Sequence, residues 1–307
     1  MKAYIGTSGW NYKHWWNGEF YPKDVKPADW LKFFARHFDT VEINNSFYRL
    51  PSEIAFQNWR TRVPSEFVFS VKASRFLTHI KRLKDPEEPL ALFFSRAKHL
   101  KDRLGPVLFQ LPPRFNMNLE RLEIFLSALK PHARKLKVRS VIEFRDATWL
   151  VPAVFDLMRK YRVAVCFSDW QDVHVTGPVT SDFVYVRRHF GTAGGGNYSR
   201  KALNSDVMQI RRWLEDRLDV YLYFNNDSGG HAIRNAKYVR EALTDGDFHS
   251  PPDIGGVDAT SRRSREASFN GADGVVGNAT SGRTHSETLR QSQPPRLRRC
   301  GGFASFY

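Results

Sequence analysis

The chain has 307 residues, of which 41% are hydrophobic, and a formal charge of +15, so it can bury one large core or two ordinary ones. Its apolar runs are too short to cross a bilayer and a strand-like run starts at Ala3, so neither a membrane span nor a signal peptide is expected. Two cysteines, Cys166 and Cys300, exclude a disulfide framework and a cysteine-based zinc site, and they favour the reducing cytoplasm.

Eight short runs rich in β-branched and aromatic residues recur along the chain. Their first residues lie 31 positions apart on average, which is typical of repeated βα units. Most are continuous hydrophobic runs, as expected for parallel strands that are buried on both faces. The runs lie at residues 3–6, 40–43, 67–71, 107–111, 140–144, 163–167, 183–186 and 220–224.

Amphipathic helices are predicted in most of the gaps, because apolar residues there repeat at intervals of three and four. The exception is the segment Gln171–Asp182, where Gly177-Pro178 and alternating Val and Thr leave no room for a regular helix. Eight strands that alternate with helices over about 244 residues predict an α/β fold, a TIM (β/α)₈ barrel with an irregular connection between strands six and seven. The predicted helical stripes lie at residues 30–38, 90–97, 119–129, 154–161, 207–218 and 232–243.

Composition changes sharply at Asp245. Residues 245–307 are rich in Ser, Gly, Arg and Asp and show no apolar periodicity, so we predict a disordered tail after a barrel domain of residues 1–244. The tail has eight arginines and seven acidic residues, so +14 of the total charge of +15 belongs to the domain. A basic domain favours an anionic ligand. The alternative is that its lysines and arginines only keep a helical surface soluble.

Polar residues follow each predicted strand, and in a TIM barrel these positions face the active site. Charged side chains at the ends of apolar strands are costly unless they are paired, so a shared polar pocket is the simplest explanation. The predicted substrate-binding residues are Trp10, Asn44, Tyr48, Arg145, Asp169, Arg187, His189, Asn225 and Asn226.

Three residues form the predicted catalytic set. Glu42 and Glu143, from strands two and five, are candidates for the general acid and base of a hydrolase or isomerase. Alternatively, the two glutamates only neutralise Lys72, Arg145 and Arg187 in an ion-pair layer. Lys72, the third residue, could form a Schiff base, but nearby glutamates are expected to keep its amine charged, which favours anion binding.

An anion site is predicted at the loops after strands seven and eight, Gly191–Gly196 and Asp227–Gly230. TIM barrels often bind phosphate there, and the second loop opens onto a helix N-terminus with free backbone N–H groups. Arg187 is expected to line this open pocket and to contribute little to the core, while Arg145 reaches a second charged group of the ligand. The alternative is that the glycines only permit tight loops.

The loop after the first strand is unusually aromatic. Its aromatic residues could stack on the bases of single-stranded nucleic acid, or they could pack over the barrel as a lid with a small core of its own. The lid is favoured because so many aromatic rings rarely all face water. The residues are Trp10, Tyr12, Trp15, Trp16, Phe20 and Tyr21.

Eight separated motifs carry a resemblance to a known family: GTSGWNY, FYP, TVEINNSFYRLP, SVKASRFLTH, LFQLPPRF, EFRDATW, YVRRH and YFNND. From Met1 to about Leu243 the chain resembles the YecE-like family, also called domain of unknown function seventy-two. The resemblance implies a TIM barrel similar in architecture to endonuclease IV and xylose isomerase, with no assigned activity. Those barrels suggest Glu143, Asp169 and His189 as ligands of a divalent metal. The chain lacks a dense His and carboxylate motif, however, so no metal or cofactor is expected.

The sequence therefore predicts an enzyme that acts on a small anionic substrate, such as a phosphorylated sugar or nucleotide, by acid–base chemistry. The alternative from another functional class is a nucleic-acid-binding protein that uses a basic, aromatic face without catalysis.

Overall fold

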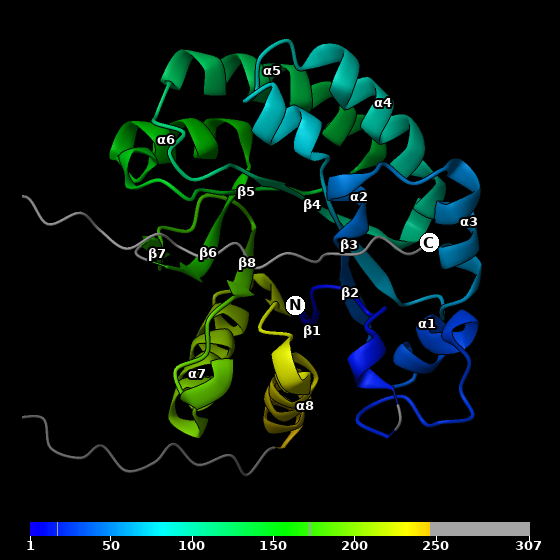
Figure 1. Cartoon of the computed structure of the whole chain (residues 1–307). Helices are drawn as coiled ribbons and strands as arrows, with labels where there is room; N and C mark the ends of the chain where they lie inside the picture. Colours follow the sequence, from blue (N-terminus) through cyan, green and yellow to red (C-terminus); the bar gives the residue numbers. More distant parts are fainter. Residues whose placement is uncertain (17, 172, 246–307) are drawn as a thin grey trace, which may run out of the picture. The chain divides into compact units, whose positions relative to one another are not determined.

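The computed structural model describes residues 1–16, 18–171 and 173–245 (Figure 1). The predicted disordered tail, apart from Asp245, lies outside the described residues. Eight parallel strands match the eight predicted runs. They are β1 (Ala3–Thr7), β2 (Thr40–Ile43), β3 (Val68–Lys72), β4 (Leu104–Gln110), β5 (Ser140–Glu143), β6 (Ala164–Trp170), β8 (Phe183–Arg188) and β9 (Asp219–Phe224).

The strands form one sheet that nearly closes on itself. Its order is β1-β9-β8-β6-β5-β4-β3-β2, and every neighbouring pair along this path is parallel. A parallel bridge between Ser8 and Glu42 joins the two ends, β1 and β2. The strands approach closely here, since a Cβ at Gly6 would lie 2.4 Å from the carbonyl oxygen of Thr40. The predicted TIM-like barrel is confirmed.

Helices cover the outside of the sheet, and α4, α5 and α6 follow one another around it (Figure 1). The predicted stripes are confirmed, but α2 and α3 were not predicted. The helix α3 buries only Phe56, so it shows no apolar stripe; its first turn is capped by the Ser52 hydroxyl, which accepts from the Ala55 N–H at 3.2 Å. The helices are α1 (Trp30–Phe34), α2 (Asn45–Tyr48), α3 (Glu53–Thr61), α4 (Glu87–Ala97), α5 (Leu119–Leu136), α6 (Pro152–Tyr161), α7 (Arg200–Glu215) and α8 (His231–Thr244).

The connection between β6 and β8 contains no helix among its described residues, as predicted. It contains instead a short strand that was not predicted, β7 (Val173–Val175), which pairs antiparallel with β6. The Thr180 hydroxyl fixes the rest of this connection, because it donates to the Val163 carbonyl at 2.7 Å and accepts from the Val165 N–H at 3.0 Å.

Alternation along each strand separates the barrel interior from the helix-facing core. In β2, Val41 and Ile43 belong to the large core, whereas Thr40 and Glu42 face the interior. A smaller core fills the lower interior, and the hydroxyl of its Tyr223 lies 2.6 Å from the Thr40 hydroxyl and 2.7 Å from that of Ser70. Side chains therefore fill the barrel interior in layers. The layer nearest the carboxyl ends of the strands consists of polar and charged side chains, whereas the layers below it are mostly apolar or aromatic.

The aromatic loop after β1, called the lid below, is largely buried, but its rings join the large core beside α1 and do not form the small core of their own that was predicted. Trp15 and Tyr21 are fully buried, and the Tyr21 ring stacks on Trp30 at 4.7 Å between centroids. The lid is tied to the loop after β9 by His14, whose Nε2 lies 3.1 Å from a carboxylate oxygen of Asp227. Rings that are buried in this way are not available for stacking on nucleic-acid bases.

Candidate functional site

Arg187 lies at the centre of the polar layer that ends the barrel interior. Its guanidinium spans the interior from β8, with Nη2 2.9 Å from Oε1 of Glu42 on β2 and Nη1 2.6 Å from Oε2 of Glu143 on β5. Only 1% of the Arg187 residue is exposed, and both glutamates are fully buried. The expectation that Arg187 lines an open pocket and adds little to the core is wrong. Its place on the interior face of β8 makes it part of the core.

Glu42 has donors on both of its oxygens. Oε1 accepts from the Ser8 hydroxyl at 2.8 Å as well as from Arg187, and Oε2 accepts from the Tyr185 hydroxyl at 2.6 Å. Burial alone would raise the pKa of Glu42, but the Arg187 charge and these two hydroxyl groups outweigh it and hold the pKa below its ordinary value. Glu42 is therefore a carboxylate at neutral pH.

Glu143 is surrounded even more completely. Besides Arg187, it accepts from Nε of Arg145 at 3.0 Å and from the Gln110 amide at 3.0 Å, and it lies 3.2 Å from Nε2 of His189. Burial would raise the pKa of Glu143, but the charges of Arg187 and Arg145 hold it well below its ordinary value. With their pKa values held below the ordinary range, both glutamates are carboxylates near pH 7, which argues against the general-acid role predicted for one of them. The alternative, an ion-pair layer, is what the structure contains.

His189 supports this layer as a neutral imidazole. Burial and the nearby Arg187 charge lower its pKa. A neutral ring protonated on Nε2 donates to Glu143 and accepts at Nδ1 from the Asn225 amide, whose nitrogen lies 3.1 Å away.

Lys72 ends β3 beside this layer, and no carboxylate among the described residues lies within ion-pair distance of its amine. Its side chain lies over the Phe47 ring, with Nζ 4.0 Å from the centroid, and Lys72 is 8% exposed. Desolvation and the Arg187 charge lower the pKa of Lys72 to about 7, although Glu143 and Glu42 act in the opposite direction. This direction argues against the expectation that the glutamates keep the amine charged. Glu42 is already paired with Arg187, and Glu143 with Arg187 and Arg145.

Burial and the charges of Lys72 and Arg145 also lower the pKa of His79, to about 4. Its imidazole meets the Phe47 ring edge to face at 4.8 Å. The barrel mouth thus offers a neutral imidazole and a weakly basic amine that both contact one aromatic ring.

Several predicted binding residues serve the protein itself. The Arg145 guanidinium pairs with Glu143 and stacks 3.4 Å from the Trp170 ring centroid, so it does not reach across the pocket as expected. Asp169 accepts from the His189 backbone N–H at 2.7 Å and from the Tyr198 hydroxyl. Within the described ranges, no group of three His, Cys, Asp or Glu side chains is arranged to hold a metal ion.

The loops after β8 and β9 were predicted to bind an anion. The Asn226 amide donates to the Gly196 carbonyl at 3.0 Å and so joins the two loops. A Cβ placed on Gly230, just before α8, would lie 2.6 Å from a carboxylate oxygen of Glu19, which itself pairs with Arg234. A lid carboxylate thus already lies at this helix N-terminus, where it disfavours a second anion.

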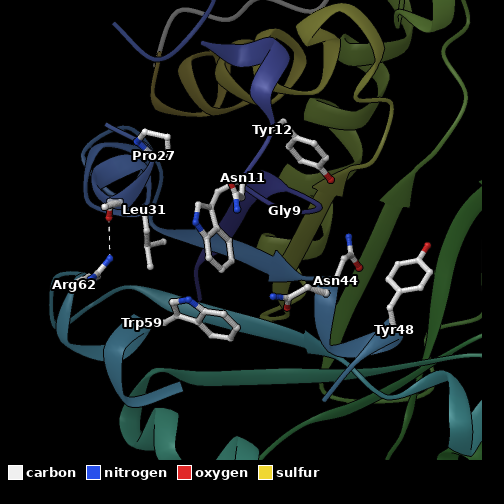
Figure 2. Close-up of a pocket in the computed structure, with 12 residues that line it drawn as sticks. Gly9, Asn11, Tyr12, Pro27, Leu31, Asn44, Tyr48, Trp59 and Arg62 are labelled. Atoms are coloured by element: carbon white, nitrogen blue, oxygen red, sulfur yellow. Dashed lines mark hydrogen bonds between the residues drawn. The ribbon is translucent and has the colours of Figure 1, made fainter. Parts of the chain in front are cut away.

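Three other predicted binding residues, Trp10, Asn44 and Tyr48, line a cavity of about 430 Å³ whose lining includes neither Lys72 nor Arg187. Figure 2 shows Asn44 and Tyr48 at one side of this cavity and Trp59 and Arg62 at another. Trp59 and Arg62 belong to or follow α3 and were not predicted, because that helix was not predicted. Phe47, which directly precedes Tyr48 in the chain and contacts Lys72, was not in the predicted set of site residues.

Removing the Tyr185 hydroxyl tests how strongly the layer depends on each donor. Tyr185→Phe should destabilise the protein by about 1–3 kcal/mol, because Oε2 of Glu42 would be left buried without a donor. Urea unfolding measures the loss. Tyr221→Phe is the matched control, as this buried hydroxyl has only a 3.5 Å contact with Arg139. Equal losses in the two variants would contradict the assignment.

No helix in the part of the chain that the structure describes is long and apolar enough to span a membrane.

Comparison with known proteins places the chain in a family. The chain is 25% identical over 273 residues to the UPF0759 protein YunF of Bacillus subtilis, which covers 78% of this chain and 94% of YunF. A crystal structure of a DUF72 family protein from Thermotoga maritima matches with a TM-score of 0.69 and 26% identity, over 80% of this chain and 100% of that one.

A D-psicose 3-epimerase from Clostridium cellulolyticum shares the fold alone, with a TM-score of 0.50 and 12% identity over 79% of this chain and 98% of the epimerase. The sequence profile described as "Protein of unknown function DUF72" matches residues 4–254, in agreement with the resemblance of the motifs. The chain therefore belongs to the DUF72 family.

Proposed function

We propose that the chain is an enzyme that acts on a small anionic substrate at the carboxyl ends of the barrel strands, with Lys72 as the group that gives and takes protons. The observation that carries this proposal is the position of Lys72. Its amine is nearly buried at the barrel mouth, has no ion-pair partner among the described residues, and has a pKa lowered to about 7. A group whose pKa lies near the working pH is suited to proton transfer.

The charges around Lys72 support an anionic substrate. Glu42 and Glu143 carry two negative charges, whereas Arg187, Arg145 and protonated Lys72 carry three positive ones. Because both glutamates are paired with arginines, the ammonium is the cation left for a ligand. An anion beside it would restore neutrality in a site with little water to screen the charge.

The other predicted residues receive supporting roles. Glu42 and Glu143 remain carboxylates that hold Arg187 in place, so they are positioning residues in this proposal rather than the proton donor and acceptor. Trp10, Asn44 and Tyr48 line the cavity that would hold the uncharged part of the substrate. Aromatic faces and amide groups together suit a polar ring or a hydroxylated chain.

Thermal unfolding with added anions tests the proposal. Inorganic phosphate and glyoxylate are the probes, and sodium chloride at equal ionic strength is the reference. A bound anion should stabilise the protein in a saturable way, by about 2.7 kcal/mol at 100 times its Kd. Lys72→Met should remove this response, whereas Lys130→Met, which replaces an exposed lysine near the Tyr161 ring, should keep it.

The sign of the pH dependence follows from the lowered pKa of Lys72. Only the ammonium form attracts the anion, so stabilisation by phosphate should weaken as pH rises through about 7. Equal stabilisation by phosphate and chloride, or a full response in Lys72→Met, would contradict the proposal.

A further inference from the structure

We infer that Lys72 is a nucleophile whose amine forms an imine with the carbonyl group of a small aldehyde or ketone that also carries an anionic group. This inference rests on the proposed function and specifies its substrate class. It starts from the geometry of the same lysine, which is nearly buried, has the Phe47 ring centroid 4.0 Å from its amine, and has no carboxylate within ion-pair distance among the described residues.

The backbone holds Lys72 firmly while its amine stays free. The Lys72 carbonyl accepts from the Ser46 hydroxyl at 2.6 Å, and β3 pairs with β4 opposite Leu108. Nζ makes no hydrogen bond or ion pair with any other residue that the structure describes; its recorded contact is the Phe47 ring at 4.0 Å. The backbone of Lys72 is thus held in place, while its amine has no hydrogen-bond partner among the described residues. Once the ammonium loses its proton, the nitrogen lone pair is available to attack a carbonyl carbon.

The charged and titratable groups around Lys72 come from several elements. Glu42 lies on β2, Glu143 and Arg145 lie on or just after β5, Arg187 lies on β8, and His79 follows β3. The carboxylates favour the ammonium form. Burial and the arginine charges disfavour it and prevail, which brings the pKa of Lys72 to about 7.

This pKa gives Lys72 a reactive fraction that a surface lysine lacks. At pH 7 about half of the Lys72 amines are neutral, whereas an ordinary lysine with a pKa near 10.4 is neutral in only about one molecule in 2,500. A less basic amine is also a weaker nucleophile, which offsets part of this gain. We therefore expect a net advantage of at least about tenfold in imine formation.

The chemistry balances without any further reagent. The neutral amine attacks the carbonyl carbon, and a proton moves from nitrogen to oxygen to give a carbinolamine. Protonation of its hydroxyl lets water leave as the C–O bond breaks and the C=N bond forms, so one water is released for each imine. A protonated imine keeps the positive charge on nitrogen, so the attraction to the anionic group of the same molecule is retained.

Reductive trapping of the full chain tests the inference. The protein is incubated at pH 7 with glyoxylate, an anionic aldehyde, and sodium cyanoborohydride, which reduces the imine to a stable secondary amine. Peptide mass spectrometry then measures the labelling rate of each lysine. Lys72 should be labelled at least about tenfold faster than the exposed Lys130, and Lys72→Arg should lose this adduct while Lys130 is labelled as before. The ratio of the two rates should fall between pH 7 and pH 10, because Lys72 with its pKa of about 7 gains little more neutral amine over this range, whereas lysines in general gain neutral amine as the pH approaches about 10.4.

Acetaldehyde, a neutral aldehyde, separates the inference from the proposed function. Labelling of Lys72 by glyoxylate at or below the rate of Lys130 overturns the imine, and the proposed function stands if phosphate still stabilises the wild-type protein but not Lys72→Met. If both aldehydes label Lys72 equally fast relative to Lys130, the anionic substrate class is overturned and the nucleophilic amine stands. A preference for glyoxylate at Lys72 alone supports both.

Discussion

Replacing Arg187 with methionine is expected to destabilise the protein by about 3–5 kcal/mol, because Glu42 and Glu143 would remain buried without their shared cation. Methionine keeps much of the side-chain volume, so the loss reports charge rather than a cavity. Urea unfolding at pH 7 measures it. The effect is large because a single guanidinium bonds two carboxylates from strands on opposite parts of the barrel.

Arg159→Met is the control for this variant, since Arg159 pairs with Asp156 on the surface of α6 and such pairs contribute only about 0–1 kcal/mol. The triple variant that adds Glu42→Gln and Glu143→Gln to Arg187→Met should recover part of the lost stability, because no unpaired charge then stays buried. A loss below about 1 kcal/mol in Arg187→Met would show that these ion pairs do not hold the barrel interior together.

Replacing Glu143 with glutamine should lower the free energy of unfolding by a similar amount, about 3–5 kcal/mol at pH 7. Glu143 is fully buried and compensates charge on both Arg187 and Arg145, so its neutral analogue leaves two buried guanidinium groups with too little negative charge. Glu123→Gln, which breaks a surface pair with Lys160, is the matched control and should change stability by less than about 1 kcal/mol.

Acid titration distinguishes this role of Glu143 from simple packing. The folded-state pKa of Glu143 lies well below its unfolded value near 4.3, so its stabilising contribution is complete above that value. The contribution should decrease as pH falls below about 4.3 toward the folded-state pKa. The stability difference between wild type and Glu143→Gln, measured by urea unfolding from pH 3 to pH 7, should therefore shrink at the acidic end. A difference that does not depend on pH would contradict the ion-pair role.

The parallel strands could be predicted from the sequence because most of them are continuous apolar runs. The strand β7 was missed because a strand of three residues, Val173–Val175, is too short to show a pattern. The members of the buried ion-pair layer were all among the predicted site residues, and an ion-pair layer was the alternative predicted for them, but the sequence did not predict which atoms pair. Glu42, Glu143, Arg145 and Arg187 all stand at strand ends, yet which of them pair depends on how the barrel closes, and a strand pattern does not contain that information.

The alternation of side chains along each strand could have predicted the position of Arg187. Alternate positions along a strand face the same side, so Thr40 and Glu42, or Tyr185 and Arg187, had to share a face. Applied to every strand, this alternation would have placed Arg187 inside the barrel rather than along an open pocket. The lowered pKa of Lys72 was not predictable in the same way, because desolvation depends on the packing of Phe47 from a different element.

The seam between β1 and β2 has a consequence for how the molecule assembles. Glu42 lies on one side of this seam, accepts a hydrogen bond from Ser8 on the other, and is bound to Arg187 from β8. The strand β1 also pairs with β9, where Ala3 lies opposite Val220, so the two barrel strands that are furthest apart in the sequence have to meet. Such long-range pairings are slow to form. The buried surroundings that lower the pKa of Lys72 therefore form only when all the strands of the barrel have been synthesised.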